Sequence, residues 1–354
     1  IMSTLKVDAI RHNSATSDAI TTAADGTCAA KITSINDGAL SNRNLLHNSS
    51  FEVWQRGTTS ASAASGGNRC TADRWSVPNR TRVAQSTDVP AGFKYAILLD
   101  REQTGGSEPF TLHQGIEKDN IRQTGSYTLS FYAKSSDINS VNINVQDRTT
   151  VAEGGTNHSS IVTNQAVTIT SSWARYTYTF TLSSIALSGT CLRISIGNTS
   201  ANQNDELLLT GIQLETGTTA TDIEKRSLGH ELSLCQRYFA IFPGRSGGVP
   251  FWQAYMGASY GYCSLPIPFS MRAVPSPTDP STGTTTSSGH IYDASGNQIT
   301  GNFGGQATTL SCAGYAPSGL AIIMSFGNHS SGNKNGVVAS WNGGSPGIYL
   351  DAEL

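Results

Sequence analysis

Hydrophobic and polar positions alternate through most of the chain between Asn44 and about Ala220. Apolar side chains occupy every second position in short runs, which Gly, Ser, Thr and Asn separate. The clearest runs are residues 127–133, 141–145, 176–182 and 192–196. A period of two indicates strands that bury one face. Its repetition predicts an all-β fold, with an antiparallel sandwich in which each sheet keeps one face wet.

The last strand of this sandwich is predicted to begin at Leu207. Its core-facing side chains are expected to be Leu208, Ile212 and Leu214. Because successive side chains of a strand point to opposite faces, Leu207 and Leu209 would then point away from the core. We expect that outer apolar face to supply contact surface between identical chains.

A short helix is predicted directly after Ser227. Apolar side chains recur there at intervals of three or four residues, at Leu228, Leu232, Cys235 and Phe239. Residues 238–242 return to the strand pattern. The helix therefore separates two β regions, and the predicted boundaries are 1–43 for an N-terminal arm, 44–220 for the first sandwich, 221–237 for the helical linker and 238–354 for a second domain.

The second β region is predicted to be an antiparallel, jelly-roll-like sandwich. Residues 252–260 alternate and are expected to form one long strand, which Pro266 and Pro268 end. Further strands are expected at 320–326, 336–341 and 348–350, and residues 276–289 form a loop of low complexity.

Residues 1–43 contain no segment that could close a core. Short strands are predicted at 5–9 and 19–22, with Ser, Asn and Asp between them. Two interpretations are open. The segment is either a disordered tail or an arm that adds a strand to a neighbouring subunit.

Composition narrows the class of protein. Hydrophobic residues make up 37% of the 354 residues, which favours folded cores over disorder. The net charge of -2 gives no electrostatic case for binding nucleic acid or an anionic membrane. No apolar run has the length of a membrane span, so membrane insertion is not expected.

Catalytic motifs are absent from the sequence. It has no GxSxG, HExxH, phosphate loop or GxGxxG pattern, and its seven histidines are scattered. His230-Glu231 lacks a second histidine. Asp100 and Glu102 could flank a sugar bond as a carboxylate pair, but surface acids are too common for this to carry weight. We therefore expect no enzyme.

Cation sites are weakly indicated. The sequence DASGNQ at 293–298 lacks the glutamate that closes a calcium loop, so it is interpreted as a turn. A structural calcium in the first sandwich stays possible, and the nearest acids to the motifs described below are Glu52 and Asp73.

Aromatic residues have two possible roles. Trp54 and Trp75 are expected to pack at the edge of the first sandwich, and Arg56 and Arg74 to pair with nearby carboxylates. In the second region, candidate ligand-binding residues follow from their position beside Gly- and Ser-rich turns, where an exposed ring could stack on a sugar. They are Tyr292, Tyr315 and Trp341. Core packing is the alternative for each.

Four phrases carry a resemblance to a known family. They are NLLHNSSFEVWQRG (44–57), CTADRW (70–75), GIQLETGTTATDIEKRS with ELSLCQRYF (211–239), and IPFSMRAVPSP (267–277) followed by LDAEL at 350–354. In this order they resemble bacteriophage tail-fibre and virion-appendage proteins that contain carbohydrate-binding-module-like β-sandwiches. The opening STLKVDAI also resembles the N-termini of structural proteins of marine phages.

The resemblance implies a non-enzymatic virion protein, a tail fibre or receptor-binding appendage for host attachment. It implies a homotrimer, an arm that attaches the chain to other virion proteins, and a host surface glycan or receptor as the partner. The alternatives are a capsid decoration protein or head fibre and, from another class, a glycan-cleaving tailspike.

The resemblance also bears on the cysteines. Phage proteins assemble in the reducing host cytoplasm, where disulfides rarely persist. No pair has the CxxC spacing of a zinc or redox site. We expect reduced thiols at all six positions, which are Cys28, Cys70, Cys191, Cys235, Cys263 and Cys312.

Overall fold

The computed structural model shows an all-β chain with one α-helix, α1 (Leu228–Gln236), among the residues that it describes. These are 43–243 except 61–67, 71, 79–80, 102–107 and 151–155, together with short strands before residue 40 and the segments 252–256, 260–266, 270–272, 276–278, 290–292, 310–315, 321–327, 334–340 and 347–352. Within these parts all strand pairs are antiparallel. They hold no helix with the length and hydropathy needed to cross a bilayer.

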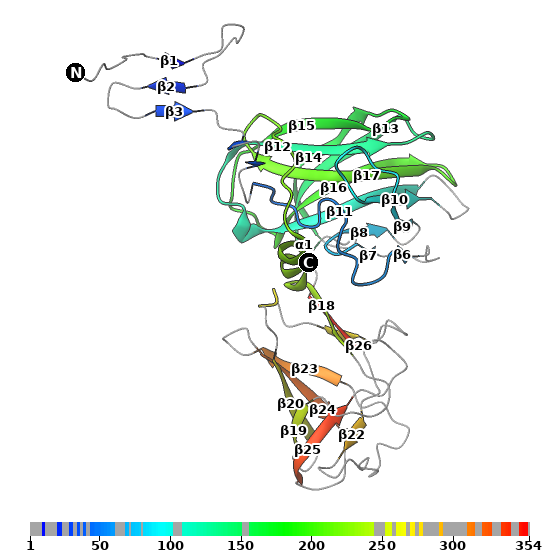
Figure 1. Cartoon of the computed structure of the whole chain (residues 1–354), viewed down its shortest axis with the longest axis vertical. Helices are drawn as coiled ribbons and strands as arrows, with labels where there is room; N and C mark the ends of the chain where they lie inside the picture. The colour runs from blue at the N-terminus through cyan, green and yellow to red at the C-terminus, as the bar shows by residue number, and fades with distance from the viewer. Residues whose placement is uncertain are drawn as a thin grey trace, which may run out of the picture.

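Two six-stranded sheets form the first sandwich (Figure 1). Sheet 1 has the order β15-β12-β17-β10-β9-β6, with bounds Ala174–Leu182, Gly125–Lys134, Glu206–Thr216, Ala96–Asp100, Arg82–Ser86 and Thr59–Ser60. Sheet 2 has the order β14-β13-β16-β11-β8-β7, with bounds Asn157–Thr168, Ser140–Arg148, Cys191–Ala201, Glu108–Glu117, Ser76–Pro78 and Asn68–Cys70. The predicted antiparallel sandwich is confirmed.

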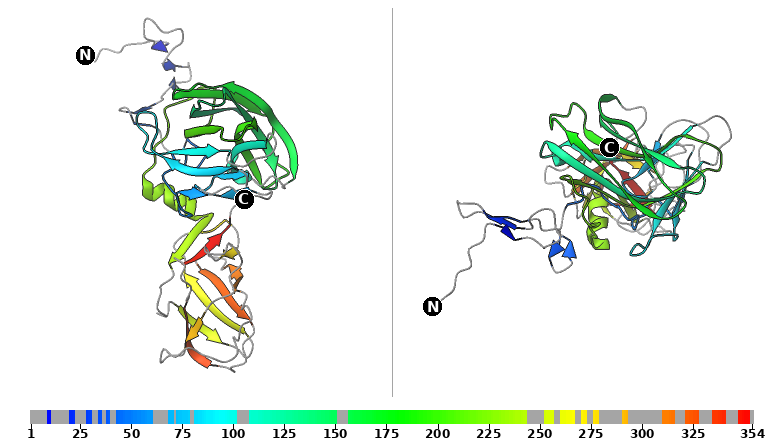
Figure 2. Two further views of the ribbon diagram at one scale, coloured as in Figure 1. Left: turned by 90° about the vertical axis from the view of Figure 1, so that its right-hand side faces the viewer. Right: turned by 90° about the horizontal axis from the view of Figure 1, so that it is seen from above.

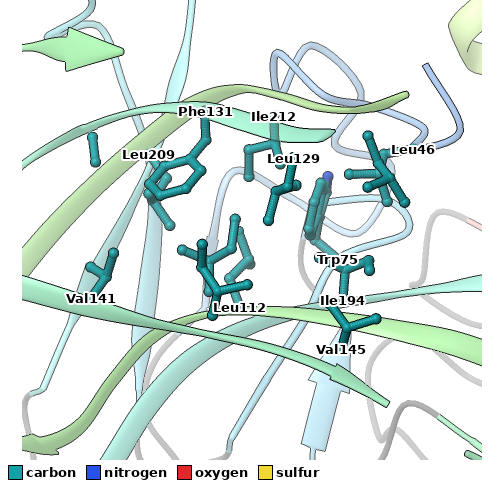
Figure 3. Packing of buried hydrophobic residues seen from close by; sticks show 14 of the residues in the cluster. Leu46, Trp75, Leu112, Leu129, Phe131, Val141, Val145, Ile194, Leu209 and Ile212 are labelled. Atoms are coloured by element: carbon teal, nitrogen blue, oxygen red, sulfur yellow. The ribbon is translucent and has the colours of Figure 1, made fainter. Parts of the chain in front are cut away.

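The main core lies between the two sheets (Figure 3). Leu129 and Phe131 of sheet 1 face Leu112, Val141 and Ile194 of sheet 2, and all five are fully buried. The predicted alternation is confirmed for these strands, because each core residue has a neighbour that points outward. As expected for the two tryptophans, Trp75 is buried in this core and Trp54 packs against it half-buried.

Strand β17 departs from the prediction at its middle. Leu207 and Leu209 are fully buried in the core and not on the outer face as expected, whereas Leu208, which was expected in the core, is only half-buried. The cause is a β-bulge. Between Ser130 and Tyr132 of β12 the partner strand has one extra residue, and Gly211 adopts a φ of 58° there. An extra residue reverses the facing of a strand. Odd positions therefore face the core before the bulge and even positions after it.

The outer face of sheet 1 is only partly exposed to solvent. Residues 217–227, which we call the strap, return across it from β17 to α1. Beneath the strap, Gln213 and Glu215 are buried, and the Glu215 carboxylate accepts from the Thr221 amide (2.9 Å) and hydroxyl (2.6 Å). Gln213 Oε1 accepts from the Glu224 amide at 2.8 Å. The expectation of a solvated outer face is wrong here, because the strap satisfies these polar groups.

Two further sheets follow α1. One has the order β18-β26-β21, with bounds Phe239–Pro243, Gly347–Asp351 and Ser276–Thr278. The other has the order β22-β25-β19-β20-β24-β23, with bounds His290–Tyr292, Lys334–Ser340, Trp252–Met256, Tyr260–Pro266, Ala321–Gly327 and Leu310–Tyr315. The strands expected near 320, 336 and 348 are confirmed.

The predicted long strand at 252–260 is wrong. Residues 252–256 and 260–266 are two strands that pair antiparallel, with Met256 opposite Gly261. In the sequence the period of two runs from residue 252 through residue 260 without interruption, so alternation alone did not reveal the reversal.

The N-terminal strands pair among themselves. β1 (Ala9–Ile10), β2 (Ile20–Thr22) and β3 (Cys28–Ala30) form one small sheet, and β4 (Ser34–Ile35) pairs with β5 (Gly38–Ala39). Figures 1 and 2 show β1–β3 outside the sandwich. The expected strand at 19–22 is confirmed, whereas most of 5–9 lies outside the described residues. The domain boundaries stay predictions.

Candidate functional site

Asn48 is the centre of a hydrogen-bonded cluster in which the first two resembling phrases meet. Its backbone lies in the left-handed region at φ 51°, which Asn tolerates better than most residues. Its amide nitrogen donates to the carbonyls of Val53 (2.8 Å) and Asp73 (3.0 Å), and its Oδ1 accepts from the Val53 amide (3.0 Å). The Trp75 indole donates to the Asn48 carbonyl at 3.0 Å. One side chain thus ties the two phrases together.

Asp73 connects this cluster to the second β region. Its buried carboxylate accepts from the backbone amide (2.6 Å) and the side chain (2.8 Å) of Gln55, and Arg56 lies 3.7 Å away. Gln55 also donates to the Phe239 carbonyl at 3.0 Å, and the Arg56 guanidinium stacks 3.5 Å from the centre of the Phe239 ring. The predicted pairing of Arg56 with a carboxylate is confirmed.

Glu117, at the end of β11, holds the two residues that follow α1. Arg237 donates to both of its carboxylate oxygens at 2.9 Å, and the Tyr238 hydroxyl donates to Oε1 at 2.6 Å. Burial alone would raise the pKa of Glu117, but these hydrogen bonds bring it below its ordinary value. Burial raises the pKa of Tyr238 to about 12. At neutral pH Glu117 is therefore an ionised carboxylate and Tyr238 a protonated phenol, so the Tyr238 hydroxyl can donate to Glu117.

The Tyr238 ring is also held from its face. The Arg74 guanidinium lies 3.3 Å from the ring centre and donates to the Gly115 carbonyl at 2.6 Å. A cation over an aromatic face stabilises the contact, more so where water is excluded. The prediction that Arg74 pairs with a carboxylate stays a prediction.

His47 lies on another side of Tyr238, with 6.0 Å between ring centres. Its Nδ1 is buried with no hydrogen-bond partner in the part of the chain that the structure describes. Burial and then the positive charges of Arg74, Arg226 and Arg237 lower the pKa of His47 to about 3. The imidazole is therefore neutral under ordinary conditions.

The ends of the second β region close the same assembly. The Arg272 amide donates to the Arg237 carbonyl at 2.8 Å, and Arg272 Nε donates to the Ala352 carbonyl at 2.9 Å. The Ala352 amide donates to the Tyr238 carbonyl at 2.7 Å. Residues from all four resembling phrases therefore meet in one place, which we call the junction.

Helix α1 supports the junction through a polar side. Ser227 caps it, as its hydroxyl accepts from the His230 amide at 3.4 Å. Glu231 is buried and accepts from the Asn48 amide. Leu228 is 56% exposed, so its predicted place on a buried apolar face is wrong. The helix is anchored by the Glu231 carboxylate together with Cys235, which is buried as the predicted apolar face required.

The two acids considered as calcium ligands, Asp73 and Glu52, do not form a cation site with other described residues. In the described residues no three His, Cys, Asp or Glu side chains gather as a cation site. Asp73 accepts hydrogen bonds on both oxygens. Glu52 is exposed beside a hollow of about 170 Å³, where the neighbouring Glu224 and Glu231 carboxylates already bind Arg226. The predicted turn at 293–298 lies outside the described residues.

Asp100, the described member of the predicted carboxylate pair, takes part in a structural ion pair. Asp100 accepts two hydrogen bonds from Arg82, at 2.9 and 2.6 Å, while Glu102 lies outside the described residues. A pairing that the sequence did not reveal joins His113 Nδ1 to the Ser195 hydroxyl at 2.7 Å. Both side chains are 2% exposed, so a substrate does not reach them in this arrangement.

The predicted ligand-binding aromatics are not brought together. Tyr292 ends β22 and Tyr315 ends β23, and these strands are the two opposite edges of their sheet. Trp341 lies outside the described residues. Their role in binding stays a prediction.

Sequence reasoning missed Glu117 and Arg237. The signal that could have found Arg237 is its place beside Tyr238 and Phe239, directly after the helix and inside a resembling phrase. Glu117 gives no such signal, because it is an isolated acid at the end of a strand 120 residues away.

The described cysteines agree with the expected free thiols. Cys70, Cys191 and Cys235 form no disulfide, and burial raises the pKa of Cys191 to about 11. The side chains of Cys28, Cys263 and Cys312 lie outside the described residues.

No family model matches the chain. A search of curated proteins also finds no match. Among solved structures, the CBM22-1 xylan-binding domain of Xyn10C from Paenibacillus barcinonensis is 15% identical, with 46% of this chain and all of that chain covered and a TM-score of 0.32. TmCBM61 in complex with β-1,4-galactotriose is 17% identical, with 50% of this chain and all of that chain covered and a TM-score of 0.29.

A phage protein is also among the similar structures. The enzymatically active domain of tailspike protein 4 from bacteriophage CBA120 is 14% identical, covering 49% of this chain and 21% of that chain, with a TM-score of 0.32. These scores are too low to assign a family or a ligand, so the β-sandwich rests on the strand pairing of this chain.

Proposed function

We propose that this protein is a non-enzymatic virion appendage, a tail fibre or receptor-binding protein that attaches a bacteriophage to a glycan on its host. The observation that carries the proposal is the junction. Four segments far apart in the sequence meet there, and their side chains connect the first sandwich to β18 and β26. These side chains are used for that connection and do not form an open site. A protein that must hold a distal surface in a fixed orientation on a particle needs such a connection.

The proposal includes an N-terminal arm bound to other virion proteins, and three identical chains around one axis. Cyclic symmetry is the usual way in which identical chains close an interface. Leu207 and Leu209 do not contribute to that interface, since both are buried. Light scattering at micromolar concentration should give the mass of a trimer, and a monomer would contradict this part of the proposal.

Imaging of the particle tests the proposed role. A gold label on the C-terminus of the chain should appear at the free ends of tail appendages, and the purified full-length protein should compete with phage for adsorption to host cells. A label over the capsid shell with no competition would favour a decoration protein or head fibre. Release of sugars from host envelope material would favour a tailspike.

A further inference from the structure

A row of partly exposed aromatic side chains lies on the outer face of sheet 1. Tyr132 and Lys134 point outward from β12, since the alternate residues Phe131 and Ala133 are in the core. Trp173 precedes β15 and Phe93 lies between β9 and β10, and both are partly exposed. We call Phe93, Tyr132 and Trp173, together with Asp88 and Lys134, the aromatic strip.

Hydrogen bonds fix one end of the strip. Asp88 Oδ1 accepts from the Trp173 indole at 2.9 Å, and Oδ2 accepts from the Lys134 ammonium at 2.6 Å. These hydrogen bonds also hold the pKa of Asp88 below its ordinary value. Because its indole nitrogen is occupied, Trp173 has only ring surface to offer a ligand. A ring that is already oriented loses little conformational freedom on binding.

The β-bulge fixes the other end. The rings of Phe93 and Tyr132 meet edge to face, 5.1 Å between centres. A Cβ on Gly211 would lie 2.6 Å from Phe93 Cζ and 3.1 Å from Tyr132 Cδ2, so only glycine allows both rings to sit over the bulge. The Lys225 ammonium lies 5.7 Å from the Phe93 ring centre and donates to the Gly92 carbonyl at 2.7 Å.

We infer that the aromatic strip binds an uncharged saccharide chain, an inference that rests on the proposed function of glycan attachment. The C–H faces of pyranose rings pack on aromatic rings, and the Tyr132 hydroxyl makes no hydrogen bond to any described residue. The one carboxylate of the strip, Asp88 at its Trp173 end, is paired with Lys134, and the Lys225 ammonium beside Phe93 donates to the Gly92 carbonyl. A neutral ligand therefore matches the strip better than a charged polysaccharide does.

The test uses the full-length protein on an array of neutral and acidic bacterial oligosaccharides, followed by titration of the strongest binder. Binding should be to neutral glycans and should change little with salt, because few charges are screened. Trp173→Ala should lower the affinity about tenfold, the effect of losing about 1.4 kcal/mol of stacking. The matched control is Ile185→Ala, which removes an exposed apolar side chain outside the strip.

A second variant separates lost binding from lost folding. Tyr132→Phe keeps the ring and removes only the hydroxyl, so it should weaken binding without a change in thermal unfolding. Three results would overturn the inference: binding only to acidic glycans, no binding to any glycan, or full binding by a Trp173→Ala, Tyr132→Ala double variant. If the double variant binds fully but Trp341→Ala does not bind, glycan attachment would stand as the function, and its site would lie in the second β region. A change from trimer to monomer in Trp173→Ala, with glycan affinity unchanged, would instead assign the strip to contact between copies.

Discussion

His47 should make the junction sensitive to acid. The pKa of the folded imidazole is about 3, whereas an unfolded histidine has its ordinary pKa of 6.5. The unfolded chain therefore binds a proton first as the pH falls, and the free energy of unfolding decreases between about 6.5 and 3. The slope reaches about 1.4 kcal/mol per pH unit for one proton.

The variant His47→Leu should lose this part of the pH dependence. Leucine has no nitrogen to bury unpaired and cannot take up a proton. Urea unfolding at about pH 7 and about pH 5, a range in which most carboxylates stay ionised, should show a smaller difference for the variant than for the natural chain. An equal difference in both proteins would refute the assignment of a neutral His47 with a buried Nδ1.

Asn48 should be worth more to stability than its size suggests. Asn48→Ala removes three side-chain hydrogen bonds and leaves the Val53 amide and two carbonyls without them, in a buried place. We expect the free energy of unfolding to fall by about 2 kcal/mol or more.

Asn204 provides a matched control for this prediction. It also has a positive φ, 66°, but it is exposed in a turn. Asn204→Ala should therefore show only the small conformational cost, and similar losses in both variants would mean that the Asn48 network contributes nothing.

At the scale of elements, the β-bulge at Gly211 in β17 should determine how the Phe93 and Tyr132 rings of the aromatic strip are placed. Gly211→Ala places a methyl group against the Phe93 ring, which must swing away from Tyr132. We expect a loss of about 2 kcal/mol, the sum of left-handed backbone strain and a lost ring contact. In a Phe93→Ala background the same substitution should cost less, which a double-mutant cycle in denaturant would measure.

The bulge also marks where sequence reasoning reached its limit. Alternation in β12, β13 and β16 identified the core residues correctly, because regular strands keep their period. In β17 the same rule placed Leu207 and Leu209 outside, since an inserted residue reverses the facing and leaves no break in an apolar run. A glycine within a strand pattern was the available signal.

Long-range contacts limited the prediction of the junction. The phrases that contain Asn48, Asp73 and Arg237 stood out in the sequence, but their meeting depends on how two sheets and a helix close around them. Trp54 and Trp75 were placed correctly because burial follows from side-chain size and apolarity. Tyr292 and Tyr315 could not be placed, since edge positions in a sheet depend on strand order rather than on local pattern.

At the scale of the whole molecule, the N-terminal arm should be dispensable for folding. Strands β1–β5 pair only with one another in the described structure, so deletion of residues 1–40 removes no strand from the larger sheets. Thermal unfolding of the truncated chain should match that of the full chain. The deletion should also remove the protein from assembled particles, and truncated protein found on purified virions would place the attachment elsewhere.

The second β region leaves the junction and returns to it at one place. Phe239 at the start of β18 lies opposite Asp351 at the end of β26, and the two strands run side by side to Pro243 and Gly347 (Figure 1). A segment whose two ends are neighbours can be replaced as a unit without moving what it is attached to. Genetic exchange of residues 240–351 would therefore leave Glu117, Arg237 and Tyr238 in place, provided that the new segment keeps Arg272, which donates to the Arg237 and Ala352 carbonyls. The sequence between residues 240 and 351 can therefore diversify while the junction that holds it stays constant.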